Sequence, residues 1–166
     1  MPWYVDMTLM LRSIIGDLDK SKFTDERIKQ ILSIGAYNVL NDADFSNSYT
    51  VSVAKNTISP DPITQDDTDF ATLTVYKSAC ILIGSEVKTE SANAISLKDG
   101  PSAIDLRGVA GSLNILYKDL CAKYESLLET YQYNNTLVGQ AILGPYSPGS
   151  MMVRGGGYGD RGNLLF

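Results

Sequence analysis

The side chains of this sequence that could do chemistry are its carboxylates and two cysteines, because the 166 residues include no histidine. Without histidine the chain lacks the Ser-His-Asp and Cys-His arrangements that activate a nucleophile, and it lacks the usual histidine-containing zinc sites. The glycine-containing segment "KDGPSAIDLRG" could be mistaken for a phosphate-binding loop, but it lacks the GxxxxGK[ST] and GxGxxG patterns. We therefore expect a protein that is not an enzyme and that needs neither a cofactor nor a metal.

The carboxylates gather at two places. Asp66, Asp67 and Asp69 precede a long apolar stretch, and we expect them to lie at the start of a helix rather than to bind a metal. Glu125 and Glu129 are four residues apart, which places both on one face of a helix. A catalytic carboxylate pair is the alternative there, but we expect a solvated face.

The two cysteines, Cys80 and Cys121, are far apart, and each falls inside an apolar helical pattern. This placement favours buried thiols over a disulfide. Two cysteines alone cannot complete a structural zinc site.

Apolar residues at three- and four-residue spacing predict the helices that position these side chains. We expect a first helix over about Met7–Leu18, capped by Asp6, and a second helix capped by Thr24. The apolar stripe of the first helix is expected to comprise Met7, Met10, Leu11, Ile14 and Leu18. The buried stripe of the second helix is expected to comprise Ile28, Ile31, Leu32, Gly35 and Val39.

Two longer helices follow, one opening at the acidic cluster and one over about Val109–Tyr133. The apolar seam of the first steps through Leu73, Tyr76, Cys80, Ile83 and Val87, as in a helix packed lengthwise on another. The seam of the second steps through Leu113, Tyr117, Leu120, Tyr124, Leu127 and Tyr131. We expect these tyrosines to pack in the core or at a subunit interface, with a binding groove as the alternative.

Two segments show the alternation typical of strands. Phe45–Pro62 predicts a short strand or an extended crossover. Near 94–107, apolar residues alternate on either side of Asp99-Gly100, which predicts a β-hairpin that packs on the bundle or pairs with a neighbouring subunit. The predicted inter-subunit residues of this hairpin are Ile95, Leu97, Ile104 and Leu106.

Size and charge narrow the class of protein further. The length suits one domain, and we expect no membrane insertion, because no run approaches the roughly 20 apolar residues of a membrane span. The chain carries a net charge of −5, and because residues 134–166 hold two arginines and one aspartate, residues 1–133 carry −6. An acidic body is a poor candidate for tight DNA binding, although DNA could pass nearby without sticking.

Residues 134–166 differ in composition from the rest of the chain. They hold eight of the 14 glycines together with many aliphatic and aromatic residues. A solvated linker would be rich in polar residues, so we expect an extended arm that binds a partner surface. The predicted partner-binding residues of the arm are Leu143, Tyr146, Met151, Met152, Val153, Arg154, Tyr158, Arg161, Leu164, Leu165 and Phe166.

The order of these elements resembles that of the head-to-tail adaptor (connector) proteins of tailed bacteriophages. Two short helices and a crossover precede a long helix opening in "DDTDFATLTVYKSACIL", the segment "ISLKDGPSAIDLRG" and a last helix "LNILYKDLCAKYESLLETYQ". The resemblance implies a homomeric ring, commonly dodecameric, below the portal, which connects head to tail and extends the DNA channel. It implies that arms fasten subunits to the portal or to each other.

The expected partners are therefore further copies of the chain, the portal protein and a downstream neck or tail protein, with DNA passing through without specific binding. The expected location is the neck of the virion, and the host cytoplasm during assembly. We expect a mainly α fold, a bundle of about four helices over residues 1–133 with a short β-hairpin, followed by the extended Gly-rich arm. The alternative is a free-standing helical interaction or regulatory domain with a flexible tail.

Overall fold

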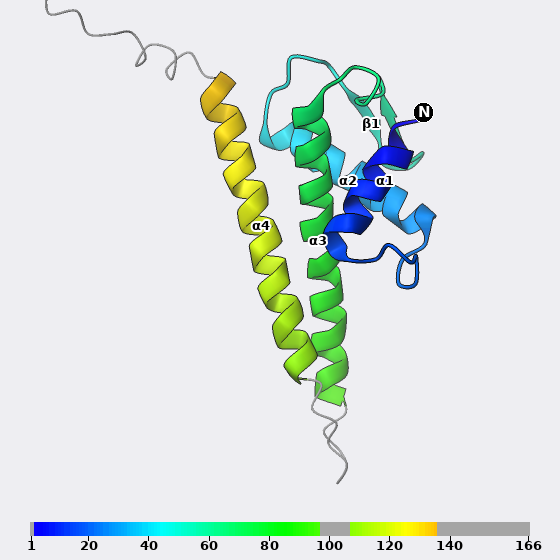
Figure 1. Ribbon diagram of the computed structural model, residues 1–166, viewed down its shortest axis with the longest axis vertical. Coiled ribbons are helices and arrows are strands. Elements are labelled where there is room, and N and C mark those ends of the chain that lie inside the picture. Colours follow the sequence, from blue (N-terminus) through cyan, green and yellow to red (C-terminus); the bar gives the residue numbers. More distant parts are fainter. Residues whose placement is uncertain (1, 97–106, 136–166) are drawn as a thin grey trace, which may run out of the picture. The chain divides into compact units, whose positions relative to one another are not determined.

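The computed structural model describes residues 2–96 and 107–135, which form four helices and one two-stranded antiparallel sheet (Figure 1). The described residues lie almost entirely in the first of two compact units, Met1–Gln132, and the second unit is Tyr133–Phe166. The mainly α fold of four helices that the sequence predicts is confirmed, and the described residues include a short β-hairpin, at a different place in the chain from the predicted one.

Helix α1 spans Trp3–Ile15, four residues earlier at its start than the sequence predicts. The predicted cap, Asp6, is wrong, because this residue lies inside the first turn. Asp61 takes that role from a distant part of the chain, since its Oδ2 accepts a hydrogen bond of 2.7 Å from the backbone N–H of Trp3. Gly16 ends the helix with a φ of 73°, a conformation that glycine adopts without steric cost.

Helix α2 spans Asp25–Asp42, and its predicted cap is confirmed, because Thr24 Oγ1 accepts a hydrogen bond of 3.3 Å from the backbone N–H of Arg27. The face predicted to be buried is the one that packs against α3. A Cβ added at Gly35 would lie 3.0 Å from the carbonyl oxygen of Thr74, so the two backbones approach closely there. The buried residues of α2 include Ile28, Leu32, Gly35 and Val39.

The β-hairpin follows α2. Strand β1 (Thr50–Ser52) pairs with β2 (Thr57–Ser59) in antiparallel register, with Val51 opposite Ile58. The sequence predicts only a single strand or crossover in this region, so the return strand is a further finding. Ile58 is buried in the main core, which anchors the hairpin to the helices.

The hairpin predicted near 94–107 is wrong at its start, because Ile95 belongs to helix α3 (Thr68–Ser96). The remaining hairpin residues named above, Leu97, Ile104 and Leu106, lie outside the described residues. Helix α3 therefore continues past the point where the sequence alternation suggests a strand.

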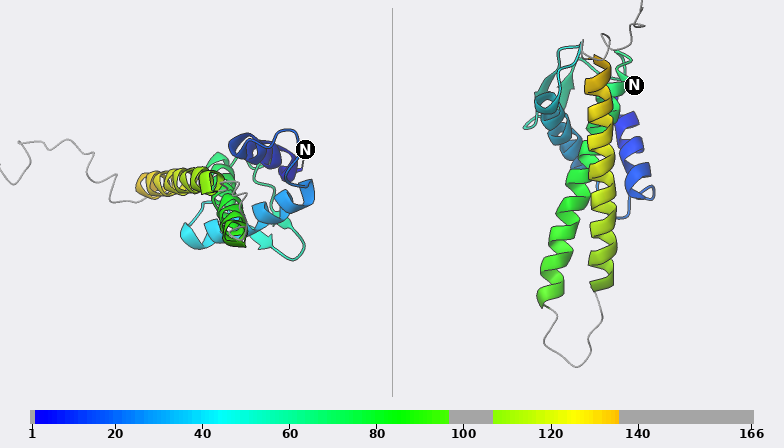
Figure 2. Two further views of the ribbon diagram at one scale, coloured as in Figure 1. Left: turned by 90° about the horizontal axis from the view of Figure 1, so that it is seen from below. Right: turned by 90° about the vertical axis from the view of Figure 1, so that its left-hand side faces the viewer.

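Helices α3 and α4 (Arg107–Asn135) run antiparallel along each other, while α1 and α2 lie on two further sides of α3 (Figure 2). Facing residues fix the register: Gly84 of α3 lies against the ring of Tyr117 of α4, where an added Cβ would come within 2.8 Å of Cε2. The predicted seams meet as expected, because the core includes Leu73 and Ile83 of α3 with Leu120 and Tyr124 of α4.

The core lies around the first half of α3. Phe70 is fully buried, and its ring stacks on that of Tyr49 with centroids 4.1 Å apart. The segment Thr68–Ala92 is long and apolar enough to cross a membrane by length and composition, but half of its most apolar window is buried inside the fold. We describe it as the core helix of the bundle.

Candidate interaction surface

Helix α1 exposes apolar side chains on the side that faces away from the core. The predicted stripe of α1 is correct for Met7 and Leu11, which are fully buried, but wrong for Met10 and for Leu18 in the loop that follows. Met10 is 46% exposed and Leu9 is 61% exposed. The four exposed residues Tyr4, Val5, Leu9 and Met10 are called the α1 face below.

Three hollows surround this face. One of about 430 Å³ lies between α1 and α3 and is lined by Leu9, Met10 and Tyr76, among others. A second, of about 360 Å³, lies on the other side of Leu9 and reaches Lys20. A third, of about 240 Å³, adjoins Met10 and has Asp66 in its lining.

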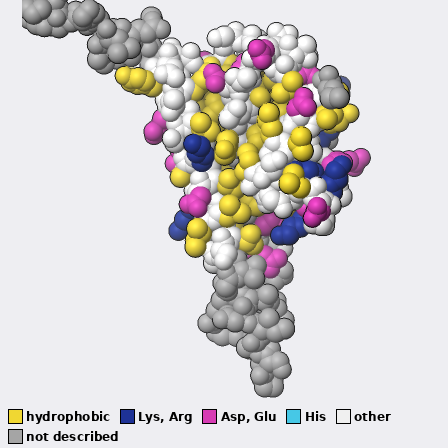
Figure 3. Space-filling model, in the orientation of Figure 1, with side chains coloured by type: hydrophobic (Ala, Val, Ile, Leu, Met, Phe, Trp, Pro, Cys, Tyr) yellow, Lys and Arg dark blue, Asp and Glu magenta, His cyan; other side chains and the backbone are white. Residues whose placement is uncertain are grey.

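Leu9 and Met10 thus form a ridge with hollows beside them. Figure 3 shows apolar side chains gathered over the middle of this side of the molecule, with charged side chains towards its edges. Such an arrangement of apolar centre and polar rim is typical of surfaces that bind another chain.

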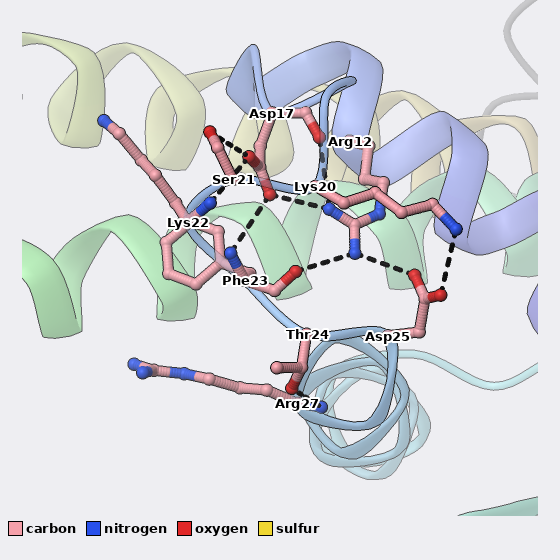
Figure 4. A network of polar contacts seen from close by, with 9 residues as sticks. All are labelled: Arg12, Asp17, Lys20, Ser21, Lys22, Phe23, Thr24, Asp25 and Arg27. Carbon is pink, nitrogen blue, oxygen red and sulfur yellow. Dashed lines mark hydrogen bonds and ion pairs between the residues drawn. The ribbon is translucent and has the colours of Figure 1, made fainter.

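A buried arginine holds α1 to the start of α2 (Figure 4). The guanidinium of Arg12 donates hydrogen bonds to Asp17 Oδ2 at 2.6 Å, to the carbonyl oxygen of Phe23 at 2.8 Å and to Asp25 Oδ1 at 2.8 Å. Lys20 adds an ion pair of 3.0 Å to Asp25. Arg12 and Asp17 are both almost completely buried, so each depends on the other for compensation of its charge.

The carboxylates of this network are held in the ionised form. Burial by itself would raise the pKa of Asp17, but hydrogen bonds from the backbone N–H groups of Lys22 and Phe23 and the charge of Arg12 bring that pKa below its usual value. Hydrogen bonds from Lys20 and Arg12 likewise lower the pKa of Asp25. The network therefore fixes the loop between α1 and α2 and, with it, the orientation of the α1 face.

A second polar cluster joins α2, α3 and α4. Asp42 Oδ2 accepts hydrogen bonds from the hydroxyl of Tyr124 at 2.6 Å and from Lys77 Nζ at 2.9 Å. Lys77 also lies over the ring of Tyr124, 4.4 Å from its centroid. Burial would raise the pKa of Asp42, but these two donors outweigh it and lower that pKa, whereas burial and the hydrogen bond to Asp42 raise the pKa of Tyr124.

The two cysteines form a disulfide between α3 and α4, with the Cα atoms of Cys80 and Cys121 5.2 Å apart. The prediction of separate, buried thiols is wrong, and both residues are only half-buried. The two cysteines are 41 residues apart in the sequence, and only the antiparallel packing of α3 and α4 brings them together. One indication of this disulfide is present in the sequence: Cys80 belongs to the predicted seam of one helix, and Cys121 is next to Leu120 in the predicted seam of the other.

The acidic cluster at the start of α3 has the predicted capping role. Asp67 Oδ1 accepts a hydrogen bond of 3.0 Å from the backbone N–H of Phe70, and its Oδ2 accepts one of 2.8 Å from the hydroxyl of Tyr49. Burial and this bond to Asp67 raise the pKa of Tyr49 to about 12. Glu125 and Glu129 are exposed on α4, as the sequence predicts.

Among residues 2–96 and 107–135, no group of three or more acidic, cysteine or histidine side chains is placed to hold a metal ion. The eleven predicted partner-binding residues of the arm, between Leu143 and Phe166, lie outside these residues. Comparison of the chain with protein-family models, with curated proteins and with solved structures finds no match. The function is therefore inferred from the α1 face and the chemistry of the chain.

Proposed function

We propose that the chain is a structural subunit of a bacteriophage neck, which forms a homomeric ring below the portal, connects head to tail and extends the DNA channel. The observation that carries this proposal is the α1 face. An exposed apolar surface bordered by hollows is typical of a subunit that binds other chains. The resemblance of the order of elements to the adaptor proteins supplies the kind of assembly.

The bundle has the rigidity that such a ring requires. The disulfide between Cys80 and Cys121 fixes α4 on α3, and the Asp42 cluster ties both helices to α2. The buried Arg12 network holds α1 to the loop before α2 and to the start of α2. A surface on a helix that is fixed by buried polar contacts keeps its shape, so less conformational entropy is lost when a neighbouring subunit binds it.

The charge of the chain suits a channel through which DNA slides. Residues 1–133 carry a net charge of −6, which repels the phosphate backbone. The arm, residues 134–166, combines apolar anchors with Arg154 and Arg161. In this proposal the arm fastens the subunit to the portal or to neighbouring copies. The conformational entropy that the arm loses when it becomes ordered on its partner offsets part of the favourable binding free energy.

The experiment that tests the proposal is native mass spectrometry and electron microscopy of the full chain, alone and with a purified portal ring. We expect ring-shaped complexes that contain many copies of the chain and attach to one end of the portal. A chain that stays monomeric in both samples and leaves the portal bare contradicts the proposal.

A truncation that removes residues 137–166 tests the arm within the same assay. We expect the helical domain to fold, with an unchanged far-ultraviolet circular dichroism spectrum, and the attachment to the portal to be lost. Hydrogen exchange of the full chain in assembled particles separates the proposal from the alternative of a free-standing helical interaction domain. Arm amides that exchange freely in those particles support the alternative.

A further inference from the structure

We infer that the α1 face and its hollows bind residues 143–166 of the arm of a second copy of this chain. This inference rests on the proposed function and identifies the partner surface of the arm. The α1 face supplies Tyr4, Val5, Leu9 and Met10 as an apolar centre, and the arm supplies side chains that such a surface binds.

A cyclic ring of more than two subunits is built from a heterologous contact, in which two different surfaces of the same chain meet. Over the described ranges 2–96 and 107–135, the other large apolar side chains with substantial exposure, such as Tyr37 and Ile115, lie on separate helices from the α1 face. In that part of the chain, these side chains are scattered and do not form a second apolar cluster on one element. The arm, which is rich in aliphatic and aromatic residues, is therefore the best candidate for the apolar partner of the α1 face.

The hollows and the arm are complementary in size and chemistry. The hollows beside Leu9 and Met10 measure about 430, 360 and 240 Å³, and the two larger ones fall within the range of about 300–1,000 Å³ that is typical of ligand pockets. The arm offers methionine and tyrosine side chains between glycines, which allow its backbone to come close to a helix surface. Tyr158, which has Gly157 and Gly159 on either side, can therefore enter a hollow without a bulky neighbour that blocks it.

The charges of the two surfaces are opposite in sign. The hollow beside Met10 has Asp66 and Asp67 in its lining, and Asp66 is exposed. The arm carries Arg154 and Arg161 among its apolar residues and has a net charge of +1. Arginine is suited to pair with carboxylates at the rim of an apolar surface.

The arm is long compared with the domain. Residues 136–166 could span at most about 100 Å, at about 3.3 Å per residue. A domain of the size of Met1–Gln132 has a radius of gyration of about 14 Å. The arm is therefore long enough to cross a neighbouring subunit and reach its α1 face.

Photo-cross-linking of the full chain tests the inference. Tyr158 is replaced by p-benzoylphenylalanine, and equal amounts of ¹⁴N- and ¹⁵N-labelled chains are mixed before irradiation and tryptic digestion. We expect mixed-isotope cross-links to the tryptic peptide that ends at Arg12 and contains Leu9 and Met10. Cross-links to this peptide within one isotope only, cross-links to other elements only, or no cross-links at all overturn the inference.

A pair of matched variants locates the contact on the α1 face. Leu9→Glu combined with Met10→Glu places charge on the ridge, and Ile115→Glu makes the same change at a side chain on α4 that is 65% exposed. We expect the mixed-isotope cross-link to fall at least tenfold in the ridge variant and to stay unchanged in the control. Equal yields in both variants, with matching circular dichroism spectra, contradict the inference.

The outcome is separable from that of the proposed function. Cross-links between copies in a chain that leaves the portal bare support this contact and contradict the neck role. A chain that decorates the portal ring without cross-links to α1 supports the neck role and overturns this contact.

Discussion

The hydroxyl of Tyr124 in α4 lies 2.6 Å from Oδ2 of Asp42 in α2, although 82 residues separate them in the sequence. The same carboxylate oxygen accepts a hydrogen bond from Lys77 of α3, so one atom connects three helices. Nearby, the side chain of Gln132 donates to the carbonyl oxygen of Asp42 at 3.0 Å. The end of α2 is therefore the point at which α4 is attached to the rest of the bundle by polar contacts.

Replacement of Tyr124 by phenylalanine tests this attachment. The change removes a hydrogen bond to a charged acceptor and keeps the ring, so we expect the free energy of unfolding to fall by about 1.5–3 kcal/mol. Tyr37→Phe is the control, because the ring of Tyr37 is exposed on α2, and we expect a change within about 0.5 kcal/mol. Urea denaturation followed by circular dichroism measures both, and equal values for the two variants would refute the role of the bond.

Reduction of the disulfide tests the second attachment of α4. A cross-link between residues 41 apart removes chain entropy from the unfolded state, so we expect reduction to cost about 3–4 kcal/mol of unfolding free energy. The double variant Cys80→Ala, Cys121→Ala should match the reduced protein and should not respond to dithiothreitol. A wild-type urea midpoint that is the same with and without the reductant contradicts this expectation.

The features that the sequence predicts correctly are those set by local chemistry. The cap of α2 at Thr24 and the capping role of Asp67 follow from the preference of such side chains for a helix start. The buried stripe of α2 and the seam of α4 follow from apolar spacing, because apolar side chains recur along one face of each helix, whereas α3 is apolar on several sides and packs against the other three helices.

The features that the sequence does not predict depend on contacts between distant residues. Helix α1 is apolar on several sides, so spacing alone does not decide that Met7 is buried while Met10 is exposed. The cap of α1 by Asp61 and the disulfide between Cys80 and Cys121 arise only once the helices are packed. The α1 face is likewise the side left over after packing, which periodicity cannot identify.

Two glycine-to-alanine substitutions should have opposite effects on stability. At Gly35 an added Cβ would come within 3.0 Å of the Thr74 carbonyl oxygen and would also crowd Ser78, so we expect a loss of about 1–3 kcal/mol. At Gly111 in α4 nothing lies within 4 Å, and alanine should stabilise the helix by about 0.5–1 kcal/mol. Thermal denaturation of both variants measures the signs, and stabilisation by Gly35→Ala would show that the two helices can move apart.

Acid should unfold the protein through its paired carboxylates. The pKa values of Asp17, Asp25 and Asp42 are all below the ordinary 3.8 in the folded chain. As the pH falls, the unfolded chain therefore takes up protons before the folded chain does, and the stabilisation by these groups is lost. The stabilisation by these three carboxylates is complete above about pH 5, and it declines as the pH drops through 3.8 towards the lowered pKa values of the folded chain.

The measurement is the urea midpoint at pH 6, 5, 4 and 3 for the wild type and for Asp42→Asn. The variant is expected to be less stable at pH 6, because Lys77 and Tyr124 lose their charged acceptor. Its midpoint should then fall less steeply between pH 5 and 3, since one of the three carboxylates no longer titrates. A wild-type midpoint that stays constant down to pH 3 would mean that these ion pairs do not hold the folded carboxylates below their usual pKa.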